Sequence, residues 1–274
     1  MQPSAALVMI MAAPLYTEGI TGRFMNELDL SSGVELKEQC DFICPWYGEV
    51  VLDRKFLVHH LASVHIAASP CPCRVVIPAA GMSPLALQLI EEWNSDKLAE
   101  VIEFDIAGMQ EKKKIYQRLV PGESHRLKCS SADINSQTDL QRILPEPPSM
   151  LPTILILEGI TYYLPPDTIT HLLCHFSTPD RRNRAVIEYM QPCGDFSPGR
   201  EALPKGVFRC IMDACGLEKV FPYHISDMKR IVEQAGGTIV RQYSLTDMEW
   251  MRTGKNKYFP RTEDGWKWCA DVDL

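Results

Sequence analysis

Acidic residues follow three apolar segments of the chain, at the points where β-strands are expected to end. Glu103 and Asp105 close the first of these segments, Asp133 follows the second, and Glu158 follows the third. Carboxylates placed in this way accept hydrogen bonds from hydroxyl and amino groups of a ligand, but they repel phosphates. The pattern therefore favours a neutral or cationic nucleoside ligand over a diphosphate dinucleotide.

A turn of small residues, Pro78-Ala79-Ala80-Gly81, precedes these carboxylates in the chain. Small side chains let the backbone approach a ligand, and Gly81 is the only one of the four expected to tolerate a positive φ without penalty. Asp105 lies 24 residues after Gly81, at a suitable distance for a ribose-binding carboxylate, and Glu103 points the same way on an ideal strand. An ordinary tight turn and a solvated strand end are the alternative interpretations.

The elements around these residues alternate between short apolar runs and helical stretches such as Pro84–Trp93 and Pro166–Phe176. Five runs are predicted strands: Arg74–Ile77, Val101–Phe104, Leu127–Ser130, Thr153–Leu157 and Ala185–Tyr189. Apolar strands separated by helices indicate a parallel sheet covered on both faces. Two late strands, Thr238–Tyr243 and Trp268–Val272, have no full helix predicted between them and are expected to add an antiparallel hairpin at the edge.

The chain divides into two predicted parts. Residues 1–70 are expected to form a helical N-terminal cap, which ends at Pro70-Cys71-Pro72 because proline cannot continue a helix. Residues 71–274 form the α/β domain, in which about 193–225, rich in Gly, Pro and Cys, is predicted to be an insertion that belongs to the cap.

Composition narrows the possible partners. A net charge of −7 and a pI near 5.5 argue against nucleic acid, whose phosphates need clustered Lys and Arg. No basic amphipathic stretch suggests a membrane surface, and the apolar run Ala5–Leu15 is too short to span a bilayer. We therefore expect a soluble, cytoplasmic protein whose ten cysteines are reduced. We expect no metal site, because neither Cys40/Cys44 nor Cys71/Cys73 is followed by a second pair at zinc-knuckle spacing.

Four of these stretches resemble the leucine carboxyl methyltransferase family, which includes polyketide O-methyltransferases of the tetracenomycin type. They are Val75–Met82, Glu103–Asp105, Ala132–Asn135 and Leu157–Pro166, in an order and spacing preserved over roughly residues 50–190. The most specific is Glu-Gly followed by an aromatic residue, Leu and Pro. The resemblance implies a Rossmann-like α/β fold of class I methyltransferases, with a mainly parallel seven-stranded sheet and S-adenosyl-L-methionine as cofactor.

The resemblance also implies which residues bind the cofactor. Those for its amino acid portion are Ala79, Ala80, Gly81, Glu158 and Gly159, with Arg54 as the nearest candidate to bind its carboxylate. Those for its nucleoside portion are Glu103, Asp105, Asp133 and Ile134.

The loop after the first strand departs from the family. The family usually has Leu-Gly-Ala-Gly followed by an acidic residue, whereas this chain has Pro78-Ala79-Ala80-Gly81-Met82. One glycine and the acidic residue are absent. This difference predicts a reshaped loop or weaker cofactor binding, and it leaves open a non-catalytic binding protein that keeps the fold.

Methyl transfer requires positioning and desolvation more than covalent catalysis. A carboxylate acceptor is already ionised at neutral pH, while a phenol or alcohol needs a general base. Candidate catalytic residues are Tyr162, Tyr163 and Tyr189, with Glu188 beside the last; Trp46, Tyr47, His59 and His60 are candidates from the cap. We expect an O-methyltransferase that acts on a carboxylate or hydroxyl of a small molecule; a protein C-terminal carboxylate is the alternative acceptor.

Overall fold

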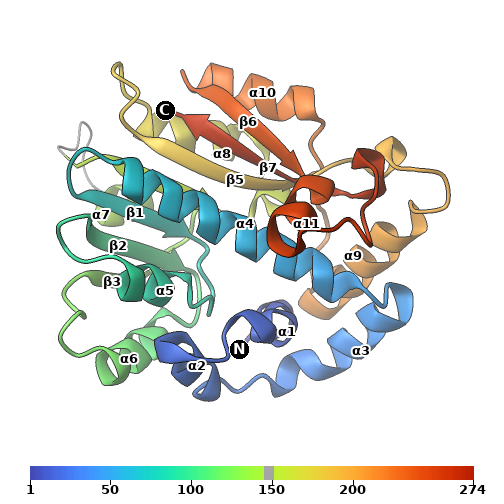
Figure 1. Ribbon diagram of the computed structural model, residues 1–274, viewed down its shortest axis with the longest axis horizontal. Helices are drawn as coiled ribbons and strands as arrows, with labels where there is room; N and C mark the ends of the chain where they lie inside the picture. The colour runs from blue at the N-terminus through green and yellow to red at the C-terminus, as the bar shows by residue number, and fades with distance from the viewer. Residues whose placement is uncertain (145–150) are drawn as a thin grey trace.

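A seven-stranded sheet forms the centre of the computed structural model, which describes residues 1–144 and 151–274 (Figure 1). Its order is β3-β2-β1-β4-β5-β7-β6, and every pairing is parallel except those of β7 with β5 and β6. The strands are β1 (Cys73–Pro78), β2 (Leu98–Asp105), β3 (Leu127–Ser131), β4 (Thr153–Leu157), β5 (Arg184–Met190), β6 (Thr238–Ser244) and β7 (Lys267–Asp273). Each of them includes one of the seven predicted strands.

Helices cover both faces of the sheet, as the apolar strands predicted. The α-helices are α1 (Pro3–Ala12), α2 (Gly19–Asn26), α3 (Val34–Ile43), α4 (Tyr47–Ala68), α5 (Leu85–Glu92), α6 (Met109–Leu119), α7 (Gln137–Ile143), α8 (Pro166–Phe176), α9 (Ala202–Cys215), α10 (Ile225–Gln234) and α11 (Leu245–Thr253). Short 3-10 turns include η2 (Ser31–Gly33) and η3 (Thr161–Tyr163).

Side chains of the central strands alternate between two hydrophobic cores, because successive residues of a strand point to opposite faces. Val75 and Ile77 of β1 belong to the core that includes α1, α4 and α5, whereas Val76 belongs to the core beneath α8 and α10. In β5, Val186 faces the first core and Ile187 the second. This alternation decides which polar residues of the strands can reach the functional site.

The N-terminal residues 1–70 fold into α1 to α4. The longest of these helices, α4, packs on β4, β5 and β7 and contacts α11, so that it runs across the face of the sheet (Figure 1). The helix α1 contacts α3, α4 and α9, beyond the edge of the sheet. The N-terminal segment therefore contributes both a covering helix of the sheet and a wall beyond it.

The C-terminal part of the chain corrects one detail of the prediction. A full helix, α11, separates β6 from β7, although none was expected between them. The strand β7 then inserts between β5 and β6, which leaves β6 at the edge. Leu245 and Met248 of α11 are buried against the first core, and that packing overrides the weak helical pattern of Leu245–Thr253.

Candidate active site

A cavity of about 440 Å³ lies at the carboxyl ends of β1, β2 and β4, where ligands of open parallel sheets bind. Its walls come from the loop after β1, from α1 and α4, from the turns that follow β3 and β4, and from α9. Eleven residues predicted for cofactor or catalysis line it: Arg54, Ala79, Ala80, Gly81, Asp105, Asp133, Ile134, Glu158, Gly159, Tyr162 and Tyr163. The structure thus brings together residues from five separate segments.

Glu103 does not line this cavity, contrary to the expectation that it lies beside Asp105 near the ligand. It is 1% exposed, and its carboxylate accepts hydrogen bonds from Lys112 Nζ at 2.7 Å and from the Tyr116 hydroxyl at 2.9 Å. Burying a carboxylate is costly unless it is paired, and α6 supplies both partners. Glu103 therefore joins α6 to the sheet.

Tyr189 also lies away from the cavity, because it points to the opposite face of β5. Its side chain belongs to the second core, and its hydroxyl accepts a hydrogen bond from Gln242 Nε2 at 3.1 Å. The neighbouring Glu188 has the parity of Val186 and faces α4 instead. The period of two along the strand would have selected Glu188 rather than Tyr189.

The loop after β1 forms the wall nearest to Asp105. Gly81 has a φ of 49° and its N–H donates to Asp105 Oδ2 at 2.9 Å, while a Cβ added at Gly81 would meet no atom within 4 Å. The space in front of Gly81 is thus open. Ala79 also adopts a left-handed conformation, with a φ of 50°, and unlike Gly81 it does so at an energetic cost.

Replacing Ala79 with glycine is expected to raise the free energy of unfolding by about 0.5–1 kcal/mol. The left-handed conformation costs an L-residue roughly 1–2 kcal/mol, which glycine avoids at a smaller cost in conformational entropy. Urea denaturation of Ala79→Gly measures the change, and Ala80→Gly serves as the control that should be destabilised. A less stable Ala79→Gly protein would show that the conformation at Ala79 carries no strain.

Five charged side chains form a buried cluster at the base of the cavity. Arg54 Nη1 lies 3.3 Å from Glu188 Oε2, Lys267 Nζ lies 2.6 Å from Glu188 Oε1, and Lys55 Nζ lies 2.9 Å from Glu158 Oε1. Gly159 N–H donates to Glu188 Oε2 at 2.6 Å. Three cations thus face two carboxylates, so within the described part of the chain this cluster has an excess of positive charge.

Burial and ion pairing act in opposite directions on this cluster. Burial would raise the pKa of Glu188, but Lys267 and Arg54 outweigh it and hold that pKa below its usual range. Burial lowers the pKa of Lys267 to about 8 although Glu188 favours its charged form, and burial likewise lowers the pKa of Lys55. Glu188 is therefore firmly ionised, whereas the two lysines are the easier groups to neutralise.

The tyrosines of the cavity are placed to donate hydrogen bonds. Burial, followed by the charge of Glu188, raises the pKa of Tyr162 well above its usual value, and burial also raises the pKa of Tyr163 and of Tyr47. Arg54 Nη1 lies 3.3 Å from the Tyr162 hydroxyl, where it opposes protonation of that oxygen. These phenols remain protonated and cannot serve as general bases near neutral pH.

The aromatic and histidine candidates from the cap, other than Tyr47, have partners elsewhere. Trp46 packs against Trp266 and Phe259, His59 Nε2 lies 2.8 Å from Glu92 Oε2, and His60 stacks on Phe56. The carboxylate beside His59 comes from α5 rather than from helical spacing within α4. None of the three candidates lines the cavity.

Several residues that matter at the site were not predicted. Lys55 follows Arg54 in the sequence but belongs to no recognised motif. Lys267 lies in β7, far along the chain from the other site residues. The apolar residues of α1 and α9 gave no signal either, because an apolar helix looks the same whether it lines a cavity or a core. Only the fold brings these segments together.

The described residues contain neither a candidate membrane-spanning helix nor a candidate metal-binding cluster. No helix among them is long and apolar enough to cross a membrane, and no group of three or more His, Cys, Asp or Glu is arranged to hold a metal ion. All ten cysteines are free thiols.

Comparison with known proteins shows that the part of the chain that forms most of this site matches a family model. The family model for leucine carboxyl methyltransferase matches residues 45–177, which contain all the motifs on which the resemblance rested. A search of curated proteins finds no match.

Solved structures share the fold at low identity. A candidate methyltransferase from Thermobifida fusca YX has a TM-score of 0.63 at 14% identity, with 99% of this chain and 94% of that chain covered. A DUF574 family protein from Streptomyces avermitilis has a TM-score of 0.65 at 12% identity, with 99% and 97% covered. Geranyl diphosphate C-methyltransferase from Streptomyces coelicolor A3(2) has a TM-score of 0.52 at 8% identity, with 80% and 77% covered.

These structures confirm the predicted Rossmann-like methyltransferase fold, but the fold does not select the acceptor atom. The strand order, the cavity at the carboxyl ends of the strands and the family match agree with one another. The chain is an S-adenosylmethionine-dependent methyltransferase, and its residues 45–177 match the family model for leucine carboxyl methyltransferase.

Proposed function

We propose that this protein is an O-methyltransferase that converts a carboxylate of a small molecule into its methyl ester. The observation that carries the proposal is the chemistry of the cavity wall: its cations and protonated phenols can hold an anion, and among the described residues it offers no histidine. Its three carboxylates, Asp105, Asp133 and Glu158, are the groups that we assign to the cofactor. A carboxylate acceptor needs groups that hold it and no base, whereas a hydroxyl acceptor needs a base.

The cavity fits S-adenosylmethionine by the types of its polar groups. Arg54 would pair with the cofactor carboxylate, Glu158 with its amino group, and Asp105 with the ribose hydroxyls; Asp133 and Ile134 would flank the adenine. Gly81 leaves open space where a side chain would otherwise intrude. When bound, S-adenosylmethionine supplies an electrophilic methyl group, so that a carboxylate lone pair forms the C–O bond as the S–C bond breaks, and no proton is transferred.

The charge of the buried cluster, as distinct from the nucleoside end of the cavity, favours an anionic acceptor. The amino acid end of the cofactor is a zwitterion and adds no net charge to a cluster in which Arg54, Lys55 and Lys267 already outnumber the two carboxylates. A low-dielectric, buried site strengthens the attraction of that positive excess for a carboxylate. The ten free thiols suit a reducing compartment, and we propose that the enzyme acts in the cytosol.

Replacing Asp105 with alanine is expected to weaken the binding of S-adenosylmethionine by about 30-fold. The change removes two hydrogen bonds to an ionised acceptor, together worth about 2 kcal/mol once competition with water is included. Calorimetric titration with S-adenosylmethionine and S-adenosylhomocysteine measures this effect. Asp96→Ala, which removes an exposed carboxylate outside the cavity, is the control and should bind like the wild type.

Transfer of a labelled methyl group to matched pairs of acids and alcohols tests the acceptor. We expect methyl esters from the acids and no product from the corresponding alcohols. Methyl ethers from the alcohols would contradict the proposed carboxylate chemistry. A folded protein that binds neither cofactor form would instead be a non-catalytic protein that keeps the fold.

A further inference from the structure

The cavity extends beyond the residues assigned to the cofactor into a part lined by apolar side chains. Val8 and Met9 of α1 form one wall of this part, Phe208 and Ile211 of α9 form the other, and Tyr163 lies with them along the cavity lining. Both helices lie outside residues 45–177, which match the family model. We call this part the α1/α9 compartment.

The two walls of the compartment contact each other. The helices α1 and α9 are in contact, and α3 packs against both. The sequence of α1, PSAALVMIMA, carries no charged side chain. Apolar walls of this kind favour a compact apolar group over the polar backbone of an extended protein terminus.

The helix α1 is fixed in place by close backbone packing at Gly33 in η2. A Cβ added there would lie 2.5 Å from the Leu7 backbone nitrogen and 2.7 Å from the Ala6 carbonyl carbon. The φ of Gly33 is −97°, so alanine is compatible with the backbone and the only conflict is with α1. Gly33 therefore allows α1 to approach the cavity.

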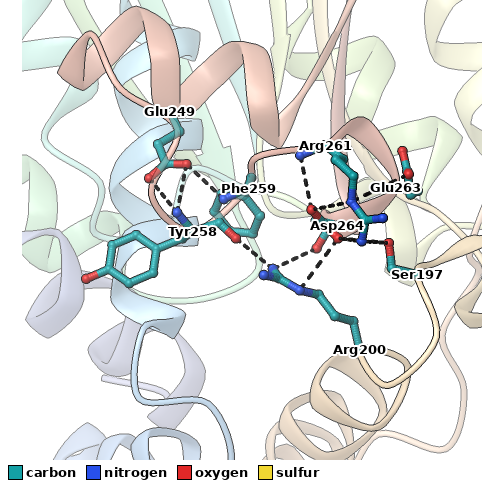
Figure 2. A network of polar contacts seen from close by, with 8 residues as sticks. All are labelled: Ser197, Arg200, Glu249, Tyr258, Phe259, Arg261, Glu263 and Asp264. Atoms are coloured by element: carbon teal, nitrogen blue, oxygen red, sulfur yellow. Dashed lines mark hydrogen bonds and ion pairs between the residues drawn. The ribbon is translucent and has the colours of Figure 1, made fainter.

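The second wall, α9, is anchored at its beginning by the polar network in Figure 2. Arg200 Nη1 donates to the Tyr258 carbonyl at 2.7 Å, and the Ser197 hydroxyl donates to Asp264 Oδ1 at 2.8 Å. The buried Glu249 carboxylate accepts N–H groups of the same loop, including that of Phe259 at 2.9 Å. The network joins the segment before α9 to the loop that precedes β7, so the wall is held at a fixed position.

We propose that the α1/α9 compartment is the acceptor site, and that it selects a small monocarboxylic acid with an apolar aromatic or aliphatic body. The inference rests on the proposed function and adds the class of acceptor. The apolar body lies between Val8 and Ile211. The acceptor carboxylate faces the Tyr162 and Tyr163 hydroxyls, because Arg54 is assigned to the cofactor carboxylate. A second carboxylate on the body would be buried against apolar walls without a partner, which excludes dicarboxylic acids.

Binding of acids to the protein saturated with S-adenosylhomocysteine tests the compartment without depending on turnover. Calorimetry with hexanoate, phenylacetate, adipate and a peptide that ends in leucine compares the classes directly. We expect the two apolar monocarboxylates to bind at least tenfold more tightly than adipate or the peptide. Preferential binding of adipate or of the peptide would overturn the proposal.

Two variants locate the acid in the compartment. Gly33→Ala displaces α1 and is expected to weaken phenylacetate binding about tenfold, while the affinity for S-adenosylhomocysteine stays within about twofold. Gly48→Ala in α4 is the matched control, because a Cβ there meets no atom within 4 Å. Ile211→Ala, which only enlarges the compartment, should shift the preference toward longer acids even if Gly33→Ala folds poorly.

The outcomes separate this proposal from the proposed function. Acids that bind and are methylated with unchanged preference in both Gly33→Ala and Ile211→Ala would place the acceptor elsewhere and leave the carboxylate chemistry intact. Apolar alcohols that bind in place of the acids and are methylated would overturn the carboxylate chemistry. If a folded Gly33→Ala protein lost both acid binding and cofactor binding, α1 would support the cofactor site as well. That result would contradict its role as a wall of the acceptor site only.

Discussion

Replacing Glu188 with glutamine is expected to lower the free energy of unfolding by about 3–5 kcal/mol, because it leaves buried cations without their anion. Glu188 is fully buried and pairs with both Lys267 and Arg54, at 2.6 Å and 3.3 Å. Without it, Glu158 is the only carboxylate left to balance the three cations of the cluster. Urea denaturation of the two proteins measures the difference.

A double-mutant cycle separates this charge effect from a loss of packing. Lys267→Met removes one cation while Glu188 keeps Arg54 and the Gly159 N–H as partners, so it should cost less than Glu188→Gln. The double variant Glu188→Gln/Lys267→Met should be more stable than the sum of the single effects predicts, by at least about 1 kcal/mol. Strictly additive effects would show that the two side chains are not coupled.

Removal of the carboxylate at Asp53 is expected to change how stability depends on pH. Asp53 of α4 is fully buried, and its carboxylate accepts a hydrogen bond from Arg252 Nε at 2.6 Å. Burial nevertheless raises the pKa of Asp53 to about 7, because it outweighs the contribution of Arg252. The folded protein therefore holds a proton on Asp53 over a pH range in which the unfolded chain has released it.

The direction of the effect follows from proton linkage. Between about pH 4 and pH 7 the folded state binds more protons at this site than the unfolded state, so the stability that Asp53 contributes falls as the pH rises. Relative to Asp53→Asn, the wild type should lose about 3 kcal/mol of stability between about pH 4.5 and pH 8. Urea denaturation at both pH values measures the divergence.

An exposed carboxylate provides the comparison for this experiment. Asp96→Asn should follow the wild type across the same pH range, because Asp96 is exposed to solvent. Parallel pH dependence of the wild type and of Asp53→Asn would mean that Asp53 is ionised throughout the range. In that case Arg252 would compensate fully for the burial of the carboxylate.

Local pattern predicted much of the fold. All seven strands were recognised, because each combines apolar side chains with flanking turns or helix starts. Such signals are local and extend over about ten residues of the sequence. The helix α11 was missed, since its stability comes from packing Leu245 and Met248 into the first core rather than from its own periodicity. The position of β7 between β5 and β6 is likewise set by contacts between residues that are far apart in the sequence.

The candidate site, like the fold, was predictable only in part from the sequence. The carboxylates at the strand ends and the Glu158-Gly159 turn were predictable, because parallel strands bring their carboxyl ends to one edge of the sheet. Glu103 and Tyr189 were misplaced for two different reasons. Glu103 found buried partners on α6, and Tyr189 has the opposite parity from Glu188 on β5.

The sequence by itself determined the strands, the family resemblance and most of the residues that line the cavity, because these depend on short motifs and on the geometry common to parallel sheets. Only the tertiary structure decided which charges share the base of the cavity and which helices enclose the α1/α9 compartment. Lys267 reaches Glu188 from a different strand, and α1 reaches α9 across most of the chain length. Such contacts produce no pattern within a short stretch of sequence. The energies of burial and charge pairing depend on neighbours that distant parts of the chain contribute.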